Sequence, residues 1–207
     1  MGTAKSLCTR CDTSLANDPR IVIWDLFNEA DSPALAYRKT EIKDKEQKAF
    51  ELLKKTFQWA REVNPSQPLT ACVWRGKWSS LERASEFNQL VLSQSDVITF
   101  HSYDKLRKYR KLVESLSGYE RPTICTEYMA RGRGSTFESI LPYLKENMIG
   151  AYNWGLVSGK TQTIYPWRSW VFKMKKEPKL WFHDILRQDG TPYDAEEIRL
   201  IQDLTGN

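Results

Sequence analysis

The chain has 207 residues, 41% of them hydrophobic and 28% charged, which is an ordinary composition for a globular protein with a sizeable core. Its formal net charge of +5 comes from Lys and Arg scattered among acidic residues rather than gathered in a stripe, so no nucleic-acid binding is predicted. The sequence contains no run of 18 or more apolar residues and its first residues lack the apolar core of a signal peptide, so neither a membrane span nor a secretion signal is predicted.

Short apolar runs alternate with amphipathic helical stretches along the chain. Strands are predicted over residues 21–27, 69–74, 97–100, 122–126 and 150–154, with helices over 45–63, 104–116 and 136–147. A long loop over 155–178 precedes further helices predicted over 179–186 and 194–204. The βαβα alternation indicates an α/β fold with a parallel sheet, either an open doubly wound sheet or part of an eight-stranded barrel.

Motifs for binding a nucleotide are missing from the sequence. An open sheet that binds a dinucleotide carries a glycine-rich turn after a strand, but neither G-x-G-x-x-G nor a phosphate-binding Walker sequence occurs. The segment from Arg131 to Ser135 contains two glycines without the required register. A nucleotide cofactor is therefore not predicted.

Two glutamates stand at the ends of strand-like runs, Glu29 after Ile-Val-Ile-Trp-Asp-Leu-Phe-Asn and Glu127 after Pro-Thr-Ile-Cys-Thr. A single glutamate is most often a solvated surface charge. Runs this apolar and β-branched are expected to be parallel strands buried on both faces, which would bring both carboxylates to one rim of the sheet. Two carboxyl groups at one rim are what a retaining glycosidase needs.

The surrounding residues resemble clan A (β/α)8 glycoside hydrolases, above all the cellulase- and mannanase-like family 5. Residues 18–29 are similar to strand four with its Asn-Glu pair, residues 126–128 to strand seven with its nucleophile, His101-Ser-Tyr103 to strand six, and Trp154 to the strand-eight tryptophan. The resemblance covers residues 17–206. It implies a partial (β/α)8 TIM barrel domain over 17–207, preceded by a divergent segment over 1–16.

The sequence departs from the family pattern at two places. Ala30 stands where the family usually has a proline after the Asn-Glu pair. The first three βα units have no counterpart, because only about twenty residues precede the first predicted strand, whereas a whole barrel takes about 250 residues. The resemblance therefore points to strands four to eight.

The roles that the resemblance implies are those of retaining hydrolysis of an oligo- or polysaccharide. Glu127 would be the nucleophile, which must be ionised, and Glu29 the acid/base, which must carry its proton when it acts. Asn28 would hold the sugar 2-hydroxyl, and Tyr103 would donate to Glu127. His101 would contact the substrate or a carboxylate; alternatively it is a satisfied histidine at a strand end.

Aromatic residues make up 12% of the chain, including eight tryptophans, which indicates stacking surfaces for sugar rings. Trp154 is the main candidate for such a surface and Trp74 a weaker one; the alternative for each is burial in the core. The aromatic loop over 165–170 would form a wall of the cleft or cover the mouth of the barrel.

No metal site or cofactor is predicted. Cys8 and Cys11 form a C-x-x-C, but no second pair of cysteines or histidines completes a zinc site. A small α/β protein that uses the two glutamates as metal ligands ranks lowest among the interpretations, since no Asp/His cluster accompanies them.

The rival hypothesis is a truncated, catalytically inert barrel with a carbohydrate-binding or structural role. If the barrel does not close, its first and last strands become sheet edges, and such a chain is expected to self-associate or to pair with a missing N-terminal part. Family members are often secreted or periplasmic, but the sequence itself does not assign a compartment.

Overall fold

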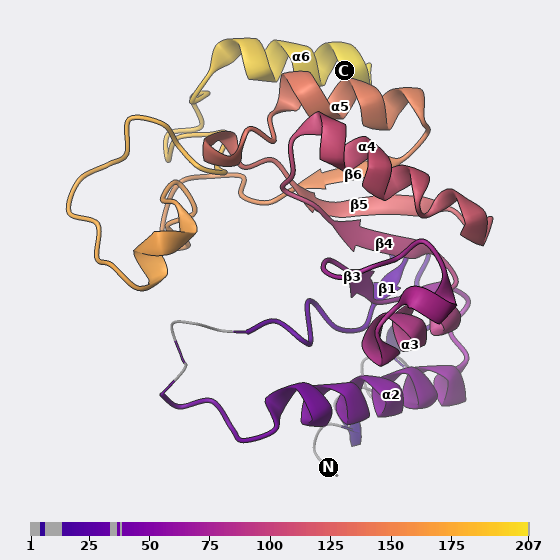
Figure 1. Cartoon of the computed structure of the whole chain (residues 1–207). Coiled ribbons are helices and arrows are strands. Elements are labelled where there is room, and N and C mark those ends of the chain that lie inside the picture. Colours follow the sequence, from indigo (N-terminus) through magenta and orange to yellow (C-terminus); the bar gives the residue numbers. More distant parts are fainter. Residues whose placement is uncertain (1–4, 7–13, 34–36, 38, 207) are drawn as a thin grey trace. The chain divides into compact units, whose positions relative to one another are not determined.

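The computed structural model describes residues 5–6, 14–33, 37 and 39–206 (Figure 1). The chain divides into two compact units, the first formed by Met1–Thr99 with Ser115–Pro122 and the second by Phe100–Glu114 with Thr123–Asn207. Cys8 and Cys11 lie outside the described residues. The proposed boundary between a segment over 1–16 and a domain over 17–207 stays a prediction.

The strands of the first unit are shorter than the sequence predicts. β1 (Trp24–Asp25) pairs in parallel with β2 (Leu69–Thr70), with Trp24 opposite Leu69. The prediction that the run over 21–27 is buried on both faces is wrong, since Val22 is 75% exposed and β1 pairs with β2 alone in a two-stranded sheet. The predicted strand over 69–74 is divided at Ala71 into β2 and β3 (Cys72–Val73).

Two α-helices of the first unit follow from local sequence signals. α2 (Lys45–Val63) has the predicted bounds, and it ends where Asn64 adopts a left-handed conformation at φ 55° before Pro65 blocks continuation. α3 (Glu86–Gln94) was not predicted; the Ser85 hydroxyl caps it by accepting from the Asn88 N–H at 3.2 Å. Both helices present apolar residues to the core, which includes Leu53, Phe57, Ala60, Val91 and Leu92.

The strands of the second unit match their predicted positions closely. β4 (Ile98–His101) passes from the first unit into the second with its last two residues, and β5 (Thr123–Tyr128) and β6 (Gly150–Asn153) follow it in order. β5 and β6 are parallel, with Ile124 opposite Gly150 and a register irregularity between Cys125 and Tyr128. Glu127 lies within this irregular stretch of β5.

The described part of the second unit contains three α-helices: α4 (Leu106–Glu114), α5 (Phe137–Glu146) and α6 (Ala195–Thr205). α5 and α6 lie side by side (Figure 1), and Ile140 and Leu144 of α5 are fully buried. The Asp194 carboxylate caps α6 by accepting from the Glu196 N–H at 2.9 Å. The predicted helices over 104–116, 136–147 and 194–204 are therefore present with bounds shifted by one or two residues.

The helix predicted over 179–186 is wrong. Its backbone bonds to other segments instead: Phe182 N–H donates to the Ile164 carbonyl at 2.8 Å, His183 N–H to Thr163 at 3.1 Å, and Ile185 N–H to Leu156 at 3.1 Å. Since these donors are taken by distant carbonyls, no i to i−4 ladder forms. The only regular element described within the loop over 155–178 is a 3-10 turn, η5 (Trp167–Trp170).

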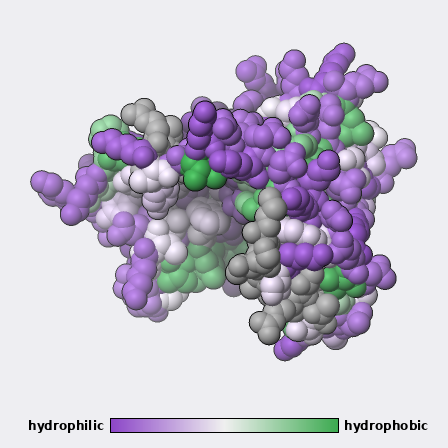
Figure 2. Space-filling model, turned by 90° about the horizontal axis from the view of Figure 1, so that it is seen from below, coloured by the Kyte–Doolittle hydropathy of each residue, from purple (hydrophilic) through white to green (hydrophobic). Residues whose placement is uncertain are grey.

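Hydrophilic residues cover most of the face shown in Figure 2, and the hydrophobic residues on it lie in separate areas. None of the helices in the described part of the chain combines the length and apolar character needed to cross a membrane.

Candidate active site

Three of the predicted site residues meet in the second unit, at the carboxyl ends of β4 and β5. The Tyr103 hydroxyl donates to Oε2 of Glu127 at 2.7 Å, and Nδ1 of His101 lies 3.4 Å from the same oxygen. The side chain of Glu127 is 12% exposed and that of His101 only 3%. A hydrogen bond donated to a carboxylate favours its charged form and fixes its orientation.

The backbone explains why these side chains come together. Ser102, which follows β4, donates its N–H to the carbonyl of Glu127 at 3.0 Å. This bond places the residues on both sides of Ser102 next to the end of β5. His101 and Tyr103, one residue to each side of Ser102, both reach Oε2 of Glu127.

Rings from the loop over 155–178 and from the segment after it pack against Tyr103. The Trp167 ring meets the Tyr103 ring edge-on at 5.0 Å between centroids, and the His183 ring meets it at 5.4 Å. Trp167 and His183 also contact each other at 5.8 Å, and both contact Phe182. Tyr103 is thus held on one side by an aromatic cluster while its hydroxyl serves Glu127.

His183 is buried and lies next to the backbone that leaves β5. Its Nδ1 is 2.8 Å from the carbonyl oxygen of Met129, so this nitrogen carries the hydrogen and donates. Burial lowers the pKa of His183 to about 4, which keeps the ring neutral. Its Nε2 is therefore an acceptor, and it is buried without a hydrogen-bond partner among the described residues.

A buried ion pair secures the same region. Nε of Arg131 donates to Oε1 of Glu197 at 2.7 Å, and Nη1 of Arg131 donates to the carbonyls of Trp181 and Asp184 at 3.2 and 3.1 Å. The Arg131 N–H also donates to the Phe182 carbonyl at 3.0 Å. Segment 181–184 is thereby bonded to the residues that follow Glu127.

Trp154 follows β6 in the same unit. Its N–H donates to the Tyr128 carbonyl at 3.2 Å, and the residue is 43% exposed. A half-exposed indole leaves a ring face available for the C–H face of a sugar. No contact between Trp154 and the Glu127 group is described, so its binding role stays a prediction.

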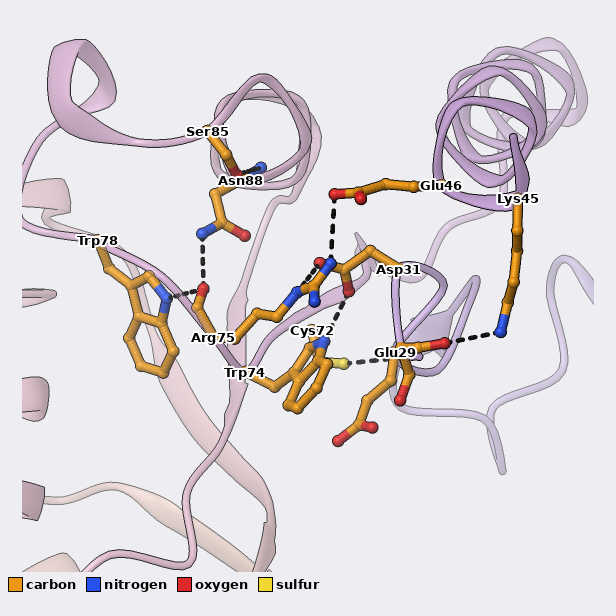
Figure 3. A network of polar contacts seen from close by, with 11 residues as sticks. Glu29, Asp31, Lys45, Glu46, Cys72, Trp74, Arg75, Trp78, Ser85 and Asn88 are labelled. Atoms are coloured by element: carbon orange, nitrogen blue, oxygen red, sulfur yellow. Dashed lines mark hydrogen bonds and ion pairs between the residues drawn. The ribbon is translucent and has the colours of Figure 1, made fainter. Parts of the chain in front are cut away.

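Glu29 and its neighbours lie in the first unit (Figure 3). Glu29 follows β1 in a left-handed conformation with φ 39°, and its N–H donates to the Cys72 sulfur at 3.4 Å. Its carbonyl accepts from the Ser32 N–H at 2.8 Å, and Nζ of Lys45 donates to the Ser32 carbonyl at 2.7 Å. Asn28 precedes this turn and is exposed.

Trp74 takes part in a polar network of the first unit (Figure 3). Its Nε1 donates to Oδ1 of Asp31 at 2.6 Å, while Nε of Arg75 donates to Oδ2 of Asp31 at 2.6 Å and Nη2 of Arg75 reaches Glu46 at 3.2 Å. The Arg75 guanidinium lies 5.4 Å from the centre of the Trp74 ring. The network stabilises the turn that contains Glu29. Trp74 thus has a structural role in addition to its predicted contact with sugar.

The sequence reasoning missed His183 and left Trp167 without an assigned partner. His183 lies in the segment predicted as a helix, and its contact with Tyr103 spans eighty residues of sequence. The one signal that could have marked it is its rarity, since the chain has just two histidines.

Comparisons with known proteins agree with this architecture. Residues 7–154 match the family model described as "Glycosyl hydrolases family 2, TIM barrel domain". A search of curated protein sequences found no significant match.

Several solved structures share the fold. Xylanase 10B from Thermotoga maritima superposes with a TM-score of 0.53 at 18% identity, covering 98% of this chain and 67% of that one. A β-D-glucuronidase from Dictyoglomus thermophilum gives 0.60 at 14% identity, covering 99% and 35%. XacCel5A gives 0.60 at 15% identity, covering 98% and 65%. This chain thus spans from about a third to two thirds of the length of these structures.

These matches confirm the predicted parallel-strand α/β fold of a partial TIM barrel. The predicted resemblance to clan A glycoside hydrolases is confirmed at that level, and the family whose model matches is family 2, while the narrower resemblance to family 5 is not confirmed.

Proposed function

Because the chain belongs to the glycosyl hydrolases family 2, TIM barrel domain, we propose that it hydrolyses O-glycosidic bonds of β-glycosides with retention of configuration. Glu127 is the nucleophile in this proposal and Glu29 the acid/base. The observation that carries it is the Tyr103 hydroxyl 2.7 Å from Oε2 of Glu127 at the end of β5, with His101 beside the same oxygen.

The chemistry proceeds in two displacements. Glu127 attacks the anomeric carbon to form a glycosyl ester while Glu29 gives its proton to the departing oxygen. Glu29 then takes a proton from water, and this water releases the sugar from Glu127 with overall retention. This mechanism requires the two carboxyl groups to stand about 5 to 5.5 Å apart during catalysis.

The neighbours of Glu127 support the role of nucleophile. The hydrogen bond from Tyr103 favours the ionised carboxylate and fixes the orientation of the group that would attack the sugar. Asn28 would hold the sugar 2-hydroxyl and Trp154 would stack on the ring, as the resemblance implies. Both of these contacts are part of the proposal.

The relatives support a saccharide as the substrate of this chain. The solved structures are named as a xylanase and β-glucuronidases, and their identity to this chain is 18% or less. A panel of nitrophenyl β-glucoside, β-xyloside, β-mannoside and β-glucuronide would identify the preferred sugar.

Azide rescue tests the two roles separately. With an activated aryl β-glycoside, Glu127→Ala should lose turnover, and azide should restore it while producing the α-glycosyl azide. Glu29→Ala should also be rescued by azide but should give the β-glycosyl azide, since the covalent intermediate still forms. Glu138→Ala, at an exposed position of α5, is the matched control and should keep the wild-type rate.

Wild-type turnover in Glu127→Ala without azide would refute the assignment. If the unmodified chain binds oligosaccharides in calorimetry yet cleaves none of the panel, the rival hypothesis of an inert carbohydrate-binding barrel holds instead.

A further inference from the structure

We propose that His183 is a positioning residue for Glu127: it holds the Tyr103 ring and the backbone after β5, so that the Tyr103 hydroxyl stays on Oε2 of Glu127. This inference rests on the proposed role of Glu127 as the nucleophile. It extends that role to a residue 56 positions further along the chain, in the segment after the loop over 155–178.

The first arm of the argument is the ring contact. The His183 ring lies 5.4 Å from the Tyr103 ring at an interplanar angle of 65°, and Trp167 closes the group at 5.0 Å from Tyr103. Such edge-to-face contacts fix the tilt of an aromatic ring. The Tyr103 hydroxyl stands at the end of that ring, so a change in tilt moves it relative to Oε2 of Glu127.

The second arm is the backbone. Met129 has a positive φ of 71°, a backbone conformation that is uncommon for residues other than glycine and is held by the surrounding structure. Nδ1 of His183 donates to the Met129 carbonyl at 2.8 Å and so fixes this peptide two residues after Glu127. His183 therefore acts on the Glu127 carboxylate in two ways: through the ring of Tyr103, which donates to it, and through the backbone at Met129, two residues after Glu127.

The chemistry of the imidazole explains why a histidine serves here. A phenylalanine would provide the same ring contact. It would also avoid the cost in stability of the buried Nε2, which has no hydrogen-bond partner among the described residues. What the phenylalanine lacks is the Nδ1–H for Met129. Burial lowers the pKa of His183, and the nearby guanidinium of Arg131 lowers it further, so the ring is neutral when it donates to Met129.

Three variants separate the two arms. His183→Phe keeps a ring and removes the donor, His183→Asn keeps a donor near the Nδ1 position and removes the ring, and His183→Ala removes both. The first readout is the ionisation of Glu127, monitored by NMR of the full chain with carboxyl-13C-labelled glutamate and without substrate. The signal of Glu127 is assigned from its loss in Glu127→Gln. Tyr103→Phe serves as the reference for full loss of the hydrogen bond.

We expect the midpoint of Glu127 ionisation to move to higher pH in His183→Ala, in the direction seen for Tyr103→Phe, and to move less in the Phe and Asn variants. With an aryl β-glycoside, His183→Ala should lower kcat about tenfold while KM changes little, because the nucleophile is disturbed more than substrate binding. Leu144→Ala, which loosens the core at a buried site in α5, should leave the Glu127 midpoint in place.

An unchanged Glu127 midpoint in all three His183 variants would overturn the proposal, and so would an equal shift in Leu144→Ala. If His183→Ala does not fold, the Phe and Asn variants decide. A shifted midpoint in a chain that cleaves no glycoside would uphold the positioning role while refuting the proposed function, so the two failures can be told apart.

Discussion

Arg131 and Glu197 form a fully buried ion pair between the turn after β5 and helix α6, with each side chain only 5% exposed. Removing one partner would leave the other charge buried without compensation. We expect Glu197→Gln to lower the free energy of unfolding by about 3 to 5 kcal/mol and Arg131→Met by at least as much, because Arg131 also serves two carbonyls. The double variant should lose less than the sum of the two, as measured by urea unfolding.

A matched pair on the same helix provides the control. Arg199 and Glu196 also form an ion pair, but their side chains are 67% and 75% exposed. Glu196→Gln should change the free energy of unfolding by less than about 1 kcal/mol. Equal losses for Glu196→Gln and Glu197→Gln would show that the buried pair has no special weight.

Gly155 is required by its backbone conformation and its surroundings. Its φ is 88°, and an added Cβ would lie 2.7 Å from Oδ1 of Asp184 and 2.9 Å from Cβ of His183. Gly155→Ala should therefore destabilise the protein by about 1 to 3 kcal/mol or more through strain and overlap. Gly159→Ala, where a Cβ meets nothing within 4 Å, should change stability by less than about 0.5 kcal/mol. Thermal unfolding of both variants would check this contrast.

The buried His183 makes stability depend on pH. Its pKa falls from 6.5 in the unfolded chain to about 4 in the folded one, so the unfolded chain binds the proton more tightly. The stabilisation is complete above pH 6.5 and is lost as the pH falls toward 4, by up to about 3 kcal/mol. Burial raises the pKa of the neighbouring Asp184, and this group acts in the opposite sense on acidification.

Comparison with His183→Phe isolates the contribution of the histidine, because the other titrating groups are common to both proteins. The stability of the wild type should decrease more steeply than that of the variant between pH 6.5 and 4.5, as measured by urea unfolding at several pH values. Parallel curves for the two proteins would contradict a neutral, buried His183.

Tyr103→Phe removes the hydroxyl from Oε2 of Glu127 and leaves the ring in its aromatic cluster. A hydrogen bond to a charged group contributes about 1.5 to 3 kcal/mol, so kcat for an aryl β-glycoside should fall about 10- to 100-fold. Tyr152→Phe is a suitable control, since this residue of β6 is 65% exposed and no hydrogen bond of its hydroxyl is described. A Tyr103→Phe variant with the wild-type pH profile and kcat would remove the main support for Glu127 as the nucleophile.

Local signals were enough for much of the fold. The apolar runs before Glu127 and over 150–154 gave β5 and β6 nearly in full, and the periodicity over 45–63 with Asn64-Pro65 gave α2 to the residue. The segment over 179–186 has helical periodicity too, but its N–H groups donate to Leu156, Thr163 and Ile164. Pairing between segments so far apart in the sequence cannot be seen in a local pattern.

The same difference applies to the site. The family resemblance implied that Tyr103 donates to Glu127, and the structure contains this hydrogen bond. Tyr103 follows β4 and Glu127 lies near the end of β5, and these two strands are neighbours in the sheet. The sequence left two interpretations of Trp154, stacking on a sugar or burial in the core. The structure leaves this residue 43% exposed, and its contact with a sugar stays a prediction.

By itself the sequence determined the alternation of strands and helices and the residue types at the strand ends, since both depend on neighbours a few positions apart. Only the tertiary structure decided which residues support those strand ends. The His183 ring packs against Tyr103, its Nδ1 donates to the Met129 carbonyl, and Arg131 pairs with Glu197. The reason is physical. Buried polar groups take whichever partner the folded chain brings within hydrogen-bond distance, and that partner can come from any point in the sequence.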